Sequence, residues 1–193
     1  MEATVPLSKI QLFETERLTI ELLLKDSDET ELLALQEKNH ADDYIKTLYS
    51  SPPQYVTFES ETKYNVNVKC GRNKRLNLNQ SRFQKLFYVV KTKNNGVVIG
   101  ALELYESGSR LEFGLFIAKE HSNQGFGKET LHRAIQIVRE SLPQNTEMKW
   151  ECYADNIASC KLAEACGFKQ QGNDSYIYKI GDVKRYSRVY ILQ

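Results

Sequence analysis

The sequence has no segment that would place it in a membrane. None of its apolar runs approaches the ~20 residues that a membrane-spanning helix requires. The opening stretch, MEATVPLSKIQLFETERL, has no basic-then-apolar leader, which favours a cytoplasmic protein over an exported one. Lysine and arginine total 26 against 25 acidic residues, and this net charge of +1 gives the whole molecule no general attraction to nucleic acid.

Cysteine is also scarce, and its spacing argues against a metal site. The four cysteines (Cys70, Cys152, Cys160 and Cys166) form no C-x-x-C pair, and the three histidines lie elsewhere in the chain. We therefore expect no zinc or other metal, and reduced, mostly buried thiols.

The apolar pattern predicts one α+β (mixed α/β) domain over residues 1–193, with a partly open sheet and helices on both faces. Two-residue alternation and turn residues predict strands at 17–23, 86–92, 97–105, 110–118, 148–154, 176–180 and 187–192. Helical spacing predicts a helix after Asp26, one that Pro143 ends, and a short one over 156–166.

The junction LFIAKEHSNQGFGKETLHRAIQIV, residues 115–138, joins a predicted strand to a predicted helix through Gly125 and Gly127. Glycine permits a sharp turn and close approach of main-chain N–H groups to a ligand. The first turn of a helix attracts anions such as phosphate, and Lys128 there is understandable if an anion lies nearby. The alternative is an ordinary connection whose glycines only allow close packing. The loop is neither a P-loop nor the dinucleotide fingerprint, because G-x-x-x-x-G-K-[ST] is absent and Thr130 occupies the last glycine position of G-x-G-x-x-G.

Two motifs together carry a family resemblance. The series LEFGLFIAKEHSNQGFGKET, followed by ADNIASCKLAEACGFK, resembles the GCN5-related N-acetyltransferases (GNAT), and within them the branch that acetylates ribosomal-protein N-termini. The opening FETERLTIELL and the ending after Gly172 are similar to the same branch, so the resemblance covers about 15–40 and 86–192. It implies the GNAT acyl-CoA N-acyltransferase fold, with a central, mostly antiparallel twisted sheet.

The resemblance also implies acetyl-CoA as co-substrate and assigns residues to it. Main-chain N–H groups of the loop would contact its diphosphate, those of Asn123, Gln124, Gly125, Phe126, Gly127 and Lys128. Strand residues Phe116, Ile117 and Ala118 would pair with the pantetheine amides as an added strand does. Asn156 matches the family asparagine that reaches the cofactor arm.

The sequence departs from the family pattern at two positions. Ser122 stands where relatives have arginine or glutamine, which removes one side-chain contact. Ala163 stands where many relatives have a tyrosine general acid, so the acid is unassigned.

Acetyl transfer needs a neutral amine, which favours an α-amine as acceptor. At pH 7 a lysine amine is neutral in about one molecule in 2500, whereas a chain N-terminus is neutral in roughly 10% or more. Glu112 is our candidate general base, because it shares a strand face with Gly114 and Phe116 and matches an acidic residue of relatives. Asp174 and Glu103 are weaker alternatives, and a salt bridge is the structural alternative for Glu112.

Ser159 is our second catalytic candidate. The resemblance implies a hydrogen bond from its hydroxyl to the leaving sulfur, although a first-turn serine that merely supports Asn156 fits equally well. A strand N–H near Phe116 would stabilise the oxyanion.

A variable basic insert at about 41–85 has no recognised counterpart. Its part from Lys63 to Lys85 holds seven basic and no acidic residues. It is either a solvated loop or a surface for an acidic partner such as RNA or an acidic peptide. Aromatic residues that could line an acceptor cleft precede it, namely Tyr44, Tyr49, Tyr55, Phe58 and Tyr64.

Two functions follow from these features. The first is an N-acetyltransferase, monomeric or homodimeric, that acetylates a small amine or a protein N-terminus, for example of an acidic peptide or ribosomal protein. The second is a non-catalytic acyl-CoA-binding module that recognises RNA or a protein through the insert.

Overall fold

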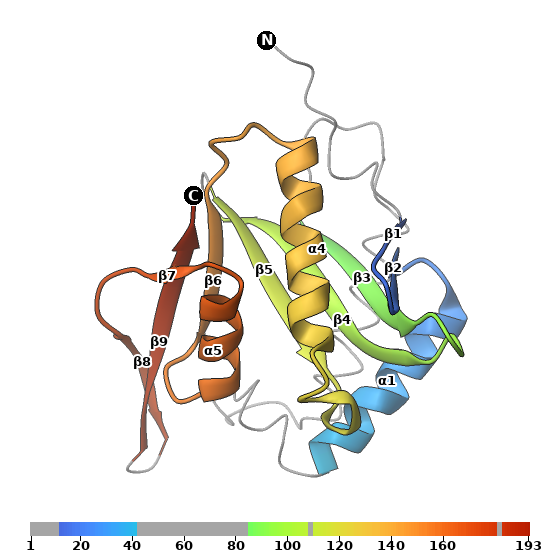
Figure 1. Cartoon of the computed structure of the whole chain (residues 1–193). Coiled ribbons are helices and arrows are strands. Elements are labelled where there is room, and N and C mark those ends of the chain that lie inside the picture. Colours follow the sequence, from blue (N-terminus) through green and yellow to red (C-terminus); the bar gives the residue numbers. More distant parts are fainter. Residues whose placement is uncertain (1–11, 42–84, 108–109, 181–182) are drawn as a thin grey trace.

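The computed structural model describes residues 12–41, 85–107, 110–180 and 183–193, which form one twisted sheet with helices on both faces (Figure 1). The strands are β1 (Leu12–Glu14), β2 (Leu18–Leu22), β3 (Lys85–Thr92), β4 (Val98–Ser107), β5 (Arg110–Ile117), β6 (Met148–Tyr153), β7 (Lys169–Gln170), β8 (Ser175–Ile180) and β9 (Val183–Leu192). The helices are α1 (Asp26–Ala41), α4 (Phe126–Ser141) and α5 (Ile157–Ala165), with a short 3-10 turn, η2 (Lys119–His121). Apart from its two ends, the predicted basic insert lies outside the described residues, as do Cys70 and the aromatic side chains of that region.

The described strands pair in the order β1-β2-β3-β4-β5-β6-β9-β7, and β8 pairs with β9. Every pair is antiparallel except β5 and β6. That exception follows from connectivity, because α4 lies between the two strands and a strand–helix–strand crossover returns parallel. The predicted mixed sheet is therefore confirmed.

The turn between β3 and β4 lies at the position that the sequence predicts. Gly96 has φ +68°, a left-handed conformation that glycine adopts without steric cost. Its N–H donates to the Thr92 carbonyl at 2.9 Å, and the Thr92 N–H donates to the Val97 carbonyl at 3.0 Å. The predicted hairpin at Asn94–Gly96 is thus present.

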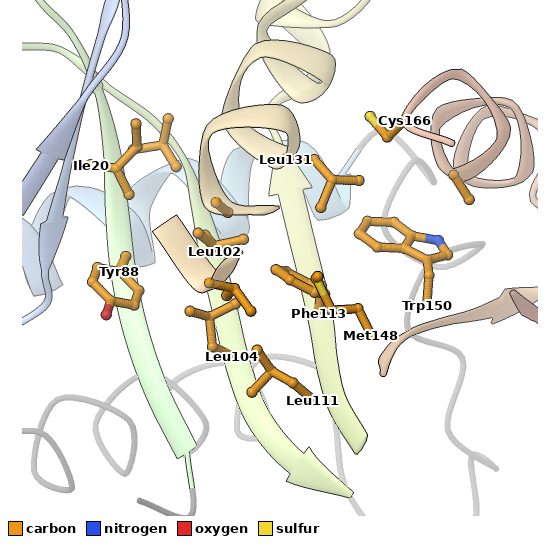
Figure 2. Packing of buried hydrophobic residues seen from close by; sticks show 14 of the residues in the cluster. Ile20, Tyr88, Leu102, Leu104, Leu111, Phe113, Leu131, Met148, Trp150 and Cys166 are labelled. Atoms are coloured by element: carbon orange, nitrogen blue, oxygen red, sulfur yellow. The ribbon is translucent and has the colours of Figure 1, made fainter. Parts of the chain in front are cut away.

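Helices α4 and α5 cover one face of the sheet, and α1 covers part of the other (Figure 1). The larger core lies under α4 and α5, where Leu131 of α4 packs near Phe113 of β5, and Trp150 of β6 lies near Cys166 at the end of α5 (Figure 2). The smaller core packs Leu32 of α1 with strand residues such as Phe116. Burial of these alternating apolar side chains drives the layers together.

Strand β5 keeps the predicted alternation. Leu111 and Phe113 belong to the core under α4 and α5, whereas Phe116 belongs to the core under α1. Glu112, two and four residues from Gly114 and Phe116, therefore shares the α1 side with them, as predicted. Its side chain is buried, with 6% of its surface exposed.

Candidate functional site

The two parallel strands at the centre of the sheet separate halfway along their length. Their paired positions are Leu111–Met148, Glu112–Lys149 and Phe113–Trp150. Beyond Phe113 and Trp150 no further pair joins them, although β5 continues to Ile117 and β6 to Tyr153. Figure 1 shows β5 and β6 diverging towards the N-terminal end of α4. We call this opening the strand split.

The hydrogen bonds at the ends of β5 show which main-chain groups face the strand split. The Leu111 N–H donates towards β6, to the Glu147 carbonyl at 3.0 Å, and the Ala118 N–H donates towards β4, to the Ile99 carbonyl at 2.8 Å. Because successive residues of a strand point their main-chain groups to opposite edges, the N–H and C=O of Leu115 and Ile117 face the strand split. Those of Phe116 face β4, so of the predicted residues Phe116 to Ala118 only Ile117 presents its main chain to the strand split.

The glycine loop, residues 122–128, lies where β5 ends and α4 begins. Asn123 has φ +58° and Gly125 has φ +83°, so the chain turns twice through the left-handed region. Gly125 is the N-cap of α4 and has no side chain to cap the helix. Within the described part of the chain, no main-chain N–H from Asn123 to Lys128 has an acceptor. These donors and the helix dipole suit an anion at this end of α4.

A pocket of about 410 Å³ opens beside the glycine loop, a volume in the range of small-molecule sites. Gly125 and Lys128 line it from the loop, Thr15 from the β1–β2 turn, and His132 and Arg133 from the next turn of α4. The pocket beside the loop therefore combines the basic side chains of Lys128 and Arg133 with the carboxylate of Glu129.

Glu112 lies in a network of ionisable side chains on the α1 side of the sheet. Its carboxylate accepts a hydrogen bond from the Tyr105 hydroxyl, and Lys149 Nζ lies 3.0 Å from its Oε2. Lys149 also reaches Glu151 at 2.6 Å. Burial alone would lower the pKa of Lys149, but its bonds to Glu151 and Glu112 raise it. Burial, together with the neighbouring Glu112, raises the pKa of Tyr105, which stays protonated at neutral pH.

Ser159 lies in the first turn of α5, on the opposite face of the sheet. Its hydroxyl oxygen accepts a hydrogen bond from Trp150 Nε1 at 3.0 Å, and its main-chain N–H donates to Asn156 Oδ1 at 3.2 Å. Asn156 is thereby the N-cap of α5. The Ser159 hydroxyl also interacts with Cys152, because a hydrogen bond from Ser159 favours the thiolate form of that side chain. The structure thus brings Ser159 and Asn156 together but holds Glu112 on the other side of the sheet.

Cys152 of β6 lies next to this serine. Its Sγ is 3.6 Å from Cys160 Sγ, and burial raises the pKa of the Cys152 thiol to about 12. Cys152 is half-buried, Cys160 and Cys166 are buried, and all three are free thiols.

The weaker base candidates have other environments. Asp174 accepts two hydrogen bonds from Arg188, both at 2.7 Å, and these lower the pKa of its carboxyl group. Glu103 is half-buried and lies opposite Gly114 in the β4–β5 pairing. Asp174 is therefore held as an ion-pair partner.

The sequence patterns did not predict several side-chain contacts at this site. Arg17 and Glu129 form an ion pair beside the glycine loop, with Arg17 Nη2 2.5 Å from Glu129 Oε2. Lys149 and Tyr105 surround Glu112. The opening motif FETERL contains Arg17, but nothing in the pattern indicates its partner 112 residues away.

Two possible features are absent from the described residues. No group of three histidine, cysteine, aspartate or glutamate side chains there could hold a metal ion. No helix within the same ranges is both long and apolar enough to cross a membrane.

Comparisons with solved structures show the same fold. RimL, a ribosomal L7/L12 α-N-protein acetyltransferase solved with coenzyme A, superposes with a TM-score of 0.71 at 18% identity, over 98% of this chain and 97% of its own. The acetyltransferase from Salmonella typhimurium that modifies the N-terminal serine of L7/L12 gives 0.69 at 16% identity, over 98% of both chains. Spermidine N-acetyltransferase from Vibrio cholerae, with coenzyme A and spermine, gives 0.64 at 21% identity, over 92% and 96%.

No curated protein sequence matches the chain significantly. A family model does match: that of the acetyltransferase (GNAT) domain, over residues 17–169. This match runs from Arg17 to Lys169, the first residue of β7, and includes the strand split, the glycine loop and α5. The predicted superfamily and the prediction of an acetyltransferase are therefore confirmed. The chain belongs to the GNAT acetyltransferase domain family.

Proposed function

We propose that the protein transfers an acetyl group from acetyl-CoA to a primary amine by direct attack. The observation that carries the proposal is the strand split between β5 and β6, with unpaired N–H groups of the glycine loop at its wide end. A diphosphate suits the loop, and an extended chain of amides suits the exposed main-chain groups of β5. Both belong to coenzyme A, the ligand of two of the similar structures.

The predicted cofactor residues divide into three groups under this proposal. The N–H groups from Asn123 to Lys128 would hold the diphosphate. Ile117, with Leu115, would pair with the pantetheine amides, and Phe116 and Ala118 would hold β5 to β4. Asn156 would contact the pantetheine arm from α5 while it caps the helix.

The thioester of acetyl-CoA supplies an activated acyl carbon whose thiol leaving group, with a pKa near 8.5, departs without strong assistance. The reaction joins the amine nitrogen to that carbon, breaks the carbon–sulfur bond and transfers the amine proton away. We propose that the Glu112 carboxylate accepts this proton, directly or through a water molecule. Tyr105 and Lys149 hold the carboxylate in place.

Ser159 completes the arrangement from the other face. Because its oxygen accepts from Trp150 Nε1, its hydroxyl proton points away from that bond, and it would be donated to the sulfur of bound acetyl-CoA in place of Cys152. A group bound in the strand split would be reached by Glu112 from one face of the sheet and by Ser159 from the other. The proposal needs no tyrosine at position 163.

We propose a protein N-terminus or a small amine as the acceptor. An α-amine suits a site whose general base is a carboxylate, because a larger fraction of it is neutral at pH 7. Two neighbours are described as acting on ribosomal protein L7/L12 and one on spermidine, so both classes belong in the test.

The test is a thiol-release screen. The protein is incubated with acetyl-CoA and a panel of N-terminal peptides, polyamines and small amines, and free coenzyme A is measured with a thiol reagent. Release that depends on one class of amine supports the proposal. Binding of coenzyme A by calorimetry without release for any amine would instead favour the non-catalytic acyl-CoA-binding module.

A further inference from the structure

Arg17, at the turn between β1 and β2, contacts three parts of the glycine loop and α4 at once. Its Nη1 donates to the Gln124 carbonyl at 3.1 Å, and its Nε donates to Glu129 Oε2 at 2.7 Å. Its guanidinium carbon lies 4.4 Å from the centre of the Phe126 ring, within the range of a cation–π contact. The Arg17 side chain therefore contacts the glycine loop through Gln124, the first residue of α4 through Phe126, and the first turn of α4 through Glu129.

The turn that carries Arg17 is itself fixed. The Lys93 N–H donates to the Arg17 carbonyl at 2.9 Å, and the Arg17 N–H donates to Glu129 Oε1 at 3.0 Å. Thr15 also donates to Glu129 Oε1 through its hydroxyl, and this hydroxyl accepts from the Leu18 N–H at 2.8 Å. Hydrogen bonds to Lys93 and to α4 therefore hold the main chain from which the Arg17 side chain extends.

The bond to Gln124 sets the direction of a donor in the loop. A trans peptide points its C=O and the next N–H in opposite directions. Because the Gln124 carbonyl is held towards Arg17, the Gly125 N–H points away from it. That N–H is one of those without an acceptor in the described part of the chain. Arg17 therefore aims a free donor to the side opposite its own side chain.

The bond to Glu129 has an electrostatic role. This carboxylate lies in the first turn of α4, beside the N–H groups that suit an anion. Burial would raise its pKa, but bonds from Thr15 and Arg17 lower it, so Glu129 is ionised at neutral pH. Without the guanidinium, an unpaired negative charge would face any diphosphate at the loop.

From this geometry we infer that Arg17 is a positioning residue of the coenzyme A site. It aims the Gly125 N–H at the diphosphate and neutralises Glu129 beside it. The inference rests on the proposed function and deepens it.

The test compares coenzyme A binding by calorimetry in the wild type and in Arg17→Gln, Arg17→Lys, Glu129→Gln and the double variant Arg17→Gln/Glu129→Gln. We expect Arg17→Gln to raise the Kd about tenfold or more, because a charged partner is left unpaired. Arg17→Lys keeps the positive charge but lacks the planar guanidinium that bonds Gln124 and Glu129 at once. We expect its Kd to lie between those of the wild type and Arg17→Gln. The double variant should bind more tightly than Arg17→Gln, because the uncompensated carboxylate is gone.

Lys93→Gln is the matched control. Lys93 is a neighbouring cation whose side chain pairs with Glu14 at 3.0 Å, and among the described residues that side chain has no bond to the glycine loop. The substitution keeps the main-chain bond from Lys93 to Arg17. We expect its Kd to equal that of the wild type. With an amine from the thiol-release screen, Arg17→Gln should raise the KM for acetyl-CoA and leave kcat at saturation nearly unchanged.

The outcomes separate this inference from the proposed function. A wild type that binds no coenzyme A would overturn both. Binding by the wild type and equal binding by Arg17→Gln would overturn the inference alone, even if the variant melts at a lower temperature. A double variant as weak as Arg17→Gln would contradict the neutralising role of Arg17.

Discussion

Two glycines separated by one residue should respond oppositely to the same added methyl group. Gly125 has φ +83°, whereas Gly127 lies in the first turn of α4. A Cβ built at Gly125 meets only Arg17 Nη2, at 3.4 Å, and one built at Gly127 meets side-chain carbons of Leu115 and Leu162, each at 3.7 Å. Neither position is crowded, so the main-chain conformation decides the outcome.

The expected magnitudes follow from that conformation. Alanine in the left-handed region costs about 1–2 kcal/mol, so Gly125→Ala should lower the Tm by about 2–8 °C in a chain of this length. In a helix, alanine is favoured over glycine by up to about 1 kcal/mol, so Gly127→Ala should leave the Tm unchanged or raise it by a few degrees.

Binding should separate the variants further. If Gly125→Ala relaxes out of the left-handed region, its N–H turns away from the diphosphate. The loss of one hydrogen bond to a charged group costs about 1.5–3 kcal/mol, at least a tenfold rise in Kd. Gly127→Ala should bind coenzyme A as the wild type does, since the helical main chain keeps its N–H in place and the added Cβ meets side-chain carbons no closer than 3.7 Å.

The assay is thermal unfolding followed by circular dichroism, with calorimetric titration of coenzyme A below the melting temperature of each variant. If Gly125→Ala melts and binds like the wild type, the left-handed turn is not required and the reasoning fails. If Gly127→Ala loses affinity without losing stability, the donors lie closer to the second glycine than we propose.

Three further results are expected. Glu112→Gln should lower turnover at saturating acetyl-CoA by about 100-fold or more and change the Kd for coenzyme A little, and unchanged turnover would remove Glu112 as the base. Ser159→Ala should lower the free energy of unfolding by about 1–3 kcal/mol, because Trp150 Nε1 loses its acceptor. Denaturant titration measures this change, and a wild-type value would show that water replaces the hydroxyl. Glu129→Gln should melt below the wild type at pH 7, and this difference should shrink as the pH falls below about 4.5 and disappear below the lowered folded-state pKa. The sign follows from the lowered folded-state pKa, since such a carboxylate stabilises the fold above its unfolded pKa and loses that effect on protonation. A difference in Tm that does not change between pH 7 and acidic pH would argue against the ion pair.

The sequence predicted which side chains face the core wherever an apolar pattern repeats over many residues. The alternation of β5 correctly separates Glu112 from Phe113, because two-residue periodicity persists over eight residues. The apolar spacing over residues 131–142 predicts a core-facing stripe of five residues, Leu131, Ala134, Ile135, Val138 and Leu142. Leu131, Ala134 and Val138 are buried, and Ile135 and Leu142 are half-buried against the same core.

The unpredicted elements and contacts have identifiable causes. β1 has three residues and β7 has two, too few for a repeat to show. The partner of Glu112 depends on the parallel register that sets Lys149 opposite it, and register between distant strands leaves no trace in local composition. Arg17 and Glu129 likewise meet only because the β1–β2 turn lies beside α4.

The placement of Glu112 and Ser159 on opposite faces bears on the missing tyrosine. A tyrosine on α5 at position 163 would share the face of Ser159, but Ala163 is fully buried in the core there. A thiol leaving group needs little protonation, whereas the attacking amine must lose its proton. We therefore expect the carboxylate on the α1 face to control the rate more than any group on the α5 face. The acceptor amine would then have to approach from the α1 side, where Tyr105, Lys149 and Glu151 surround Glu112. On this reasoning, changes to those three residues should alter the choice of amine, while changes around Ser159 should act mainly on the cofactor.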